Sequence, residues 1–147
     1  MPRLALLARE VVDLCGSTET ELPVIVLTLE RLDEDLNRHL AKEEMVLFPN
    51  IADLEQRLSI GIMPAHVCFE IIANPIARTM QEHDVAGSLI AEIRQLNHEF
   101  TAPKDACPTF QVFYDGLKEF ERDLHQSIQL ENNVLFPRAL VLEDSAS

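Results

Sequence analysis

Apolar residues recur at steps of three and four along four segments of the 147-residue chain, and no segment alternates convincingly as a strand. This spacing is typical of helices that bury one face. The sequence therefore predicts an all-α fold, an up-down-up-down four-helix bundle that forms a single domain over residues 1–147. We expect a short first helix from about Pro2 to Leu14, and a long loop over residues 59–74 between the second and third helices.

Proline and glycine indicate where these helices end. Gly16 is expected to stop the first helix. The second helix is expected to begin near Pro23 and to break at Pro49, and the fourth is expected to stop at Pro137, because proline lacks the N–H that a helix interior requires. The stripes predicted to face inward include, from the first helix to the fourth, Leu4, Leu7, Val11 and Leu14; His39, Glu43 and Val46; Met80 and His83; and Ser127 and Glu131.

Two of the expected helices end in nearly the same seven residues, EEMVLFP at 43–49 and ENNVLFP at 131–137. His39 lies four residues before Glu43 and so on the same helix face, the arrangement by which one helix offers two ligands to a metal ion. The matching position before Glu131 holds Ser127, whose hydroxyl is a poor ligand for a divalent transition metal. The repeat thus predicts a two-metal site that lacks one ligand.

His83 occupies an inward position on the third helix, so His39, Glu43, His83 and Glu131 are expected to converge inside the bundle. Two carboxylates buried face to face are costly, and a cation between them removes the conflict. Imidazole and carboxylate ligands suit iron, manganese or zinc without selecting sharply among them. The alternative is that the histidines are hydrogen-bonded core residues and that the glutamates reach water at the end of the bundle.

The acidic composition narrows the range of partners. The chain has 25 Asp and Glu against 12 Lys and Arg, a formal charge of -13, which would repel nucleic acid and anionic membranes. No apolar run approaches the ~20 residues that span a bilayer and no signal peptide is evident, so we expect a cytoplasmic protein. Cys15, Cys68 and Cys107 form no CxxC pair, which indicates reduced thiols.

Three stretches carry a family resemblance: HLAKEE with VLFP over 39–49, NPI at 74–76 followed by EHD at 82–84, and LENNVLFPR at 130–138. They resemble the hemerythrin-like (HHE cation-binding) domain, specifically the C-terminal di-iron domain of iron-sulfur cluster repair (RIC) proteins of the YtfE/ScdA type. The resemblance implies two irons bridged by Glu43 and Glu131, with His39 on one iron and His83 on the other.

The resemblance also implies that two ligand histidines are missing. The family's fourth-helix histidine falls on Ser127, and its first-helix histidine would lie before Met1. His125 is about 200° around the helix from Ser127 and is expected to face solvent.

Five other residues lie near these motifs or could approach the site. His66 and Cys68, in the long loop, are expected to pack or to order that loop rather than to bind metal, and His98 is given no role. Asp35 and Glu82 are either carboxylates that orient a ligand histidine or ordinary residues of an acidic surface.

Three interpretations follow. The first is a weakened non-heme iron site, holding one ion or a labile pair, with open positions for water, O2 or NO and a role in iron storage or donation related to cluster repair and stress. No catalytic residue is predicted. The second is a metal-free hemerythrin-like bundle that acts as an interaction or regulatory module. The third is a homodimer that covers an apolar groove beside the short first helix and supplies a missing ligand.

Overall fold

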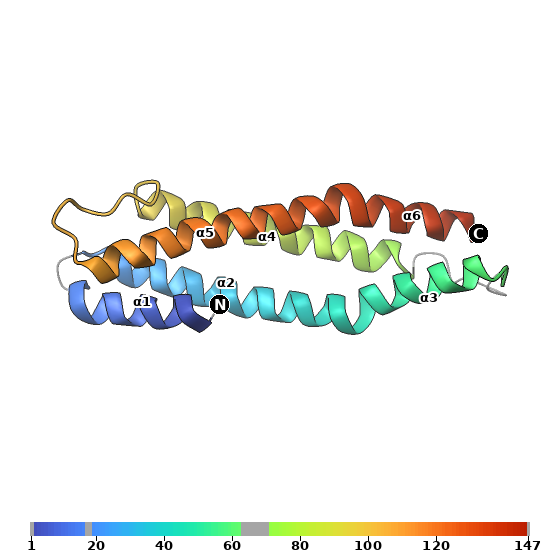
Figure 1. Cartoon of the computed structure of the whole chain (residues 1–147), viewed down its shortest axis with the longest axis horizontal. Helices are drawn as coiled ribbons and strands as arrows, with labels where there is room; N and C mark the ends of the chain where they lie inside the picture. The colour runs from blue at the N-terminus through green and yellow to red at the C-terminus, as the bar shows by residue number, and fades with distance from the viewer. Residues whose placement is uncertain (1, 17–18, 63–70, 147) are drawn as a thin grey trace. The chain divides into compact units, whose positions relative to one another are not determined.

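The computed structural model describes residues 2–16, 19–62 and 71–146, and these residues contain helices but no strand (Figure 1). The predicted all-α class is therefore confirmed. The helices are α1 (Pro2–Cys15), α2 (Leu22–Lys42), α3 (Phe48–Ser59), α4 (Ala73–Leu96), α5 (Pro108–Leu130) and α6 (Phe136–Ser145). The π-helical turn η1 (Glu43–Leu47) joins α2 to α3, and η2 (Glu131–Leu135) joins α5 to α6, so four continuous helical stretches make the predicted four-helix bundle. His66 and Cys68 fall outside the described residues.

One proline lies in the first turn of every α-helix, and this regularity explains most of the helix starts. The first helical positions have no intrahelical use for an N–H, and the fixed φ of proline already suits a helix. The six residues are Pro2, Pro23, Pro49, Pro75, Pro108 and Pro137.

The predicted breaks at Pro49 and Pro137 are wrong, because each proline continues a helical stretch. In η1 the N–H of Phe48 bonds to the carbonyl of Glu43, five residues earlier, and Pro49 follows directly at the start of α3. The wider π turn moves the hydrogen-bond ladder by one residue, so proline falls where its missing N–H is tolerated. The same pattern recurs at η2 and Pro137.

The chain divides into two compact units, each with its own apolar core. Unit 1 contains Met1–Leu36 and Val85–Gln126, and unit 2 contains Asn37–Asp84 and Ser127–Ser147. In unit 1 the buried side chains come from α1, the first part of α2, the second part of α4, and α5; among the fully buried are Val11, Leu22, Ile25, Leu32, Ile90, Ile93, Phe113 and Leu117.

The buried stripe of α1 differs from the predicted one. Leu14 is 62% exposed, whereas Ala8 is buried beside Leu4 and Val11. Leu4, Ala8 and Val11 lie on one helix face because they are spaced by four and three residues. The prediction preferred large apolar residues and therefore passed over Ala8. The helix ends just before Gly16, as predicted, and an added Cβ at this position would lie 2.5 Å from the Val12 carbonyl oxygen, so only glycine fits.

Grooves flank α1 on two sides within unit 1. One, of about 480 Å³, lies between α1 and α5 and is lined in part by Leu4, Leu7, Val112 and Phe120. The other, of about 300 Å³, lies between α1 and the first part of α2. Apolar surface beside the short first helix was predicted, but a second chain covering it stays a prediction.

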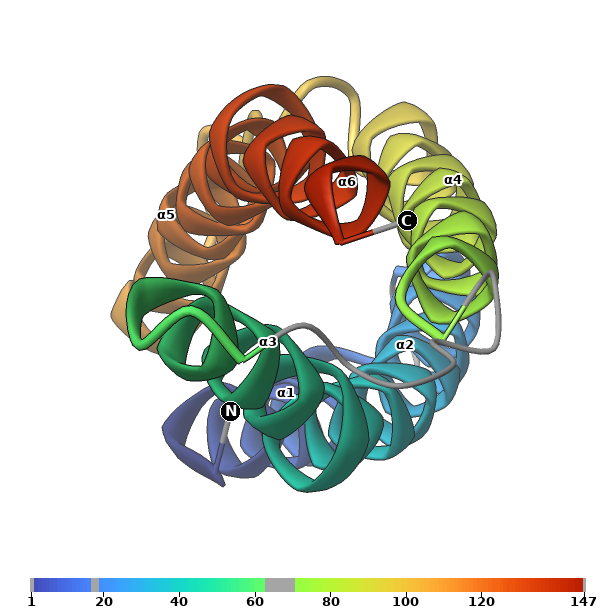
Figure 2. The same ribbon diagram turned by 90° about the vertical axis from the view of Figure 1, so that its right-hand side faces the viewer.

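Unit 2 is built around the two π turns and the beginning of α4. Its core contains Leu47, Leu54, Ile72, Ile76, Phe136 and Ala139. Figure 2 shows the ribbons of α3, α6 and the beginning of α4, which carry or adjoin these residues. Val46, predicted to face inward, is 49% exposed, and Leu47 is buried in its place. On α4 the predicted Met80 is likewise exposed, and Thr79 takes the inward position.

A carboxylate from α6 holds the beginning of α4. The Glu143 side chain is buried and accepts hydrogen bonds from the N–H groups of Ile72 and Ala73, at 2.8 and 3.1 Å. The first N–H groups of a helix have no partner within it, and a negative charge there also favours the helix dipole. Sequence reasoning missed this contact because it joins residues about seventy positions apart.

We expect Glu143→Ala to lower the free energy of unfolding by about 1–2 kcal/mol, because two buried N–H groups lose their acceptor. Asp144→Ala removes the same charge from the neighbouring exposed position and should change stability by less than about 0.5 kcal/mol. Urea unfolding followed by circular dichroism measures both, and equal effects of the two variants would contradict the assignment.

Candidate metal centre

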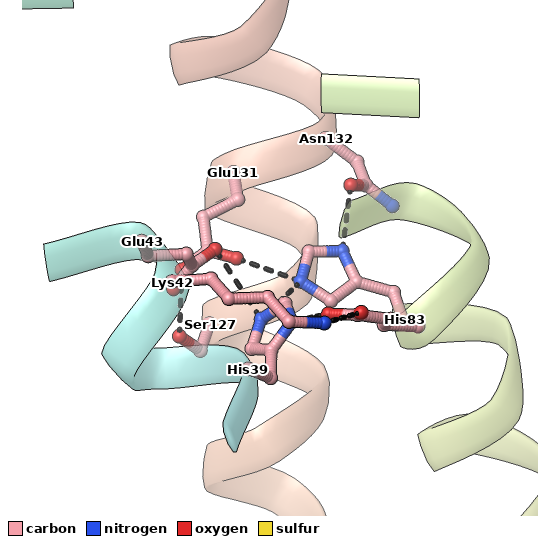
Figure 3. Close-up of polar contacts among 8 residues, drawn as sticks. His39, Lys42, Glu43, His83, Ser127, Glu131 and Asn132 are labelled. Carbon is pink, nitrogen blue, oxygen red and sulfur yellow. Dashed lines mark hydrogen bonds and ion pairs between the residues drawn. The ribbon is translucent and has the colours of Figure 1, made fainter. Parts of the chain in front are cut away.

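The two π turns present equivalent glutamates within unit 2. Glu43 opens η1 and Glu131 opens η2, and both carboxylates point toward the imidazoles of His39 and His83 (Figure 3). His39 stands one turn before Glu43 on α2, while His83 comes from α4. π turns are frequent at functional sites, and here both fall on the first residue of the repeated heptapeptide.

The four predicted ligand residues lie together. One ligand-type atom from each of His39, Glu43, His83 and Glu131 falls within 4.8 Å of all the others. His83 Nε2 is 2.9 Å from Glu131 Oε2, and His39 Nε2 is 3.3 Å from Glu43 Oε1. The two Nε2 atoms are 3.1 Å apart. The convergence is a feature of the structure, and metal ligation by these atoms stays a prediction.

The other nitrogen of each imidazole determines what faces the centre. His39 Nδ1 is 2.9 Å from the carboxylate of Glu82, and His83 Nδ1 is 2.9 Å from Oδ1 of Asn132. Both partners are acceptors, so each Nδ1 carries the proton. In a neutral imidazole the Nε2 atom then presents a lone pair, which is the form that binds a metal. Both lone pairs are directed at the space between the carboxylates.

Glu82 belongs to a charged chain that reaches the surface. Its second oxygen pairs with the ammonium group of Lys42, which is exposed. Burial alone would lower the pKa of His39, but the nearby Glu43 carboxylate, 3.3 Å from Nε2, and the Glu82 carboxylate outweigh it, so the pKa of His39 is raised above its usual value. The two carboxylates thus make this imidazole a stronger base, which also favours cation binding.

The donor set fits a divalent cation better than it fits an empty core. Glu43 is 1% exposed, and neither of its oxygens accepts a hydrogen bond from any residue that the structure describes. A buried carboxylate without donors costs several kcal/mol in a medium of low polarity. The two Nε2 atoms, 3.1 Å apart, are at hydrogen-bond distance, but with both protons on Nδ1 they have no hydrogen to share and present two lone pairs to each other. A cation among these atoms would remove both conflicts.

Ser127 differs from its prediction. Its residue is exposed instead of inward, yet its hydroxyl donates a long hydrogen bond of 3.4 Å to Glu131 Oε1 (Figure 3). The position four residues before Glu131 therefore borders the centre from its solvent side. His125 is exposed, as predicted, and His98 is exposed as well.

Two residues around the centre were assigned incompletely from the sequence. Glu82 was suggested to orient a ligand histidine without saying which, and the histidine that it contacts is His39 on another helix. Asn132 was missed, although its place directly after the first glutamate of the repeat was a usable signal. Asp35 is half-buried on α2 in unit 1, and its suggested role stays a prediction.

The family model for the Hemerythrin HHE cation binding domain matches residues 3–139. The chain belongs to this hemerythrin family. It is 36% identical over 141 residues, 95% of its length, to a probable iron-sulfur cluster repair protein of Haemophilus influenzae, of which it covers 57%. It is 40% identical over 115 residues, 78% of its length, to the iron-sulfur cluster repair protein YtfE of Salmonella paratyphi B, of which it covers 46%.

The chain thus spans about half the length of the curated relatives that it matches. Membership of a cation-binding family agrees with the cluster of His39, Glu43, His83 and Glu131 and supports metal binding by this hemerythrin domain. Within the described part of the chain, no helix combines the length and apolar character needed to cross a bilayer.

We expect Glu82→Ala to weaken metal binding by about 10–100-fold, because His39 would lose the acceptor that fixes its orientation and tautomer. Glu44→Ala is the matched control, since it removes the same charge from an exposed residue beside the centre. Competition with a chromophoric chelator measures both affinities. A chemical shift of the His39 Nδ1 nitrogen that Glu82→Ala leaves unchanged would contradict the contact even without metal.

Proposed function

We propose that this hemerythrin domain is a non-heme iron protein in which His39, Glu43, His83 and Glu131 hold one iron ion or a labile pair. The observation that carries the proposal is the buried Glu43 carboxylate, which has no hydrogen-bond donor and faces two imidazole lone pairs. Manganese and zinc suit the same donors and would compete. The proposal places the protein in the cytoplasm, where relatives named for iron-sulfur cluster repair suggest a role in iron supply under nitrosative or oxidative stress.

The chain's own residues would divide the work. Glu131, half-buried and paired with His83, and Glu43, fully buried, would together supply negative charge to balance the cation. Glu82 and Asn132 would hold the two imidazoles in their binding tautomer. When bound, iron supplies a redox-active centre with positions left for small ligands such as water, O2 or NO.

The proposed site is depleted of ligands at the position of Ser127, where a hydroxyl stands 3.4 Å from Glu131. Fewer protein ligands mean weaker retention of the metal, which suits donation of iron better than permanent storage. Alternatively, a second copy of the chain could supply a ligand at that position. Sedimentation of the iron-loaded protein distinguishes an open ligand position from one filled by a second chain. A monomer would exclude the second copy.

One observation favours a metal-free alternative, an interaction or regulatory module. The raised pKa of His39 allows its protonated form to pair with Glu43, at 3.3 Å, and with Glu82, at 2.9 Å. A proton would then replace the cation as the positive charge of the centre. The two functions predict opposite results in the iron-binding experiment below.

We expect the protein to retain iron after anaerobic reconstitution with Fe(II) and desalting, and to gain about 3 kcal/mol of stability at free iron about 100-fold above the dissociation constant. Glu43→Gln should abolish that gain and stabilise the metal-free protein by about 1–3 kcal/mol, because an uncompensated buried charge disappears. Elemental analysis and thermal unfolding measure both effects.

The matched control is Glu44→Gln, an exposed neighbour that should behave as the unaltered chain. Wild-type protein that retains no iron and gains no stability from it would overturn the iron proposal and favour the metal-free module.

We expect Ser127→His to increase iron affinity by about tenfold or more, because an imidazole would replace a hydroxyl next to Glu131. Gln126→His adds the same side chain one position earlier on the helix, about 100° away, and should have no effect. Chelator competition compares them. An equal gain in affinity for the two variants would contradict the prediction that position 127, and not position 126, faces the metal.

A further inference from the structure

Unit 1 brings two cysteines together that the sequence keeps far apart. Cys15 is the last residue of α1, and Cys107 directly precedes α5. Their Sγ atoms are 3.5 Å apart although the residues are 92 positions apart, and both residues are half-buried and outside any disulfide. Figure 1 shows the end of α1 and the beginning of α5 at the same end of this unit. Because tertiary folding brings these two cysteines together, a search of the sequence for a CxxC motif does not reveal the pair.

The beginning of α5 acts on Cys107 in two ways. The Cys107 carbonyl accepts hydrogen bonds from the N–H groups of Phe110, at 3.0 Å, and Gln111, at 3.3 Å, so Cys107 stands at the N-cap of the helix. Hydrogen bonding from the backbone of Phe110, then from the Cys15 thiol, lowers the pKa of the Cys107 thiol below its usual value. A helix N-terminus stabilises a thiolate, which is the nucleophilic form of cysteine.

Cys15 has the opposite character. The hydrogen bond to Cys107 and partial burial raise the pKa of its thiol. The pair is therefore asymmetric: Cys107 is the thiol that loses its proton more readily, and Cys15 is the thiol that keeps it. Such a division between an attacking and a resolving thiol is the arrangement found where cysteines are oxidised reversibly.

We propose that Cys15 and Cys107 form a redox-active dithiol that a hydroperoxide converts into an intramolecular disulfide. The site uses no residue of the metal centre, which lies in unit 2, and it does not depend on bound iron.

The chemistry balances in two steps. The Cys107 thiolate attacks the hydroperoxide, an S–O bond forms as the O–O bond breaks, and the departing hydroxide or alkoxide takes a proton from solvent. The Cys15 sulfur then attacks the sulfenic sulfur, the S–S bond forms as the S–O bond breaks, and hydroxide leaves with the Cys15 proton as water. Two electrons pass from the thiols to the peroxide.

The structure permits this product with a small local movement. A disulfide needs its sulfur atoms about 2.05 Å apart, against 3.5 Å between the thiols here, and both cysteines stand at helix ends, where the backbone is least constrained. The bond would close a loop of 92 residues and tie α1 to α5. Closure of a long loop restricts the unfolded chain, so the oxidised protein should be harder to unfold.

The test is peroxide titration of the full chain with Cys68→Ser, in the presence of a chelator that removes metal. We expect a mass loss of about 2 Da, a peptide that links Cys15 to Cys107, and a melting temperature raised by about 5–10 °C that a reductant reverses. Cys107→Ser should react at least about tenfold more slowly, whereas Cys15→Ser should stop at a sulfenic acid that a dimedone probe traps.

Several results would overturn the proposal. These are a gain of oxygen mass without a linked peptide, a link formed only between chains, and equal peroxide reactivity of the two single variants. Peptide mapping of the chain that carries both cysteines decides the question if a serine variant fails to fold. Because metal is absent from every sample, a negative result leaves the iron proposal untouched, and the iron experiments leave this proposal untouched.

Discussion

Burial of the Glu43 carboxylate is the constraint on which the centre of unit 2 depends. Placing an ion in a core costs more than most single contacts return, so its surroundings must supply positive charge or hydrogen-bond donors. The described residues around Glu43 supply imidazole nitrogens whose protons are directed elsewhere, toward Glu82 and Asn132. The two imidazoles and Glu131 therefore present electron pairs to the same point as Glu43, and a cation or an added proton reconciles them.

The fold shows which structural features the helical periodicity of the sequence can predict. The class, the number of long helical stretches and the stop at Gly16 were predicted, because each rests on local preferences. The exchange of Val46 for Leu47 was not, since an inserted π turn shifts the inward face by one residue without a strong mark in the sequence. Proline was also misleading, because its role changes with the turn that precedes it.

The convergence of His39, Glu43, His83 and Glu131 was predicted for a different reason. Residues four positions apart on one helix share a face, and a repeated heptapeptide predicts the same local structure twice, so both features can be recognised in the sequence. The groups that surround these residues show no such pattern. The contact between Glu82 and His39 joins two helices, and the approach of Cys15 to Cys107 spans 92 positions, so both depend on tertiary packing.

The carboxylate that α6 lends to α4 gives the last helix a role beyond filling the core. His83 stands on α4 three turns after the N–H groups that Glu143 holds, so α6 fixes the beginning of the helix that carries this imidazole. A tail trimmed by proteolysis ahead of Glu143 would leave every candidate ligand in place and still loosen the centre. α6 thus supplies no candidate ligand and still contributes to the centre, because its carboxylate holds the start of α4.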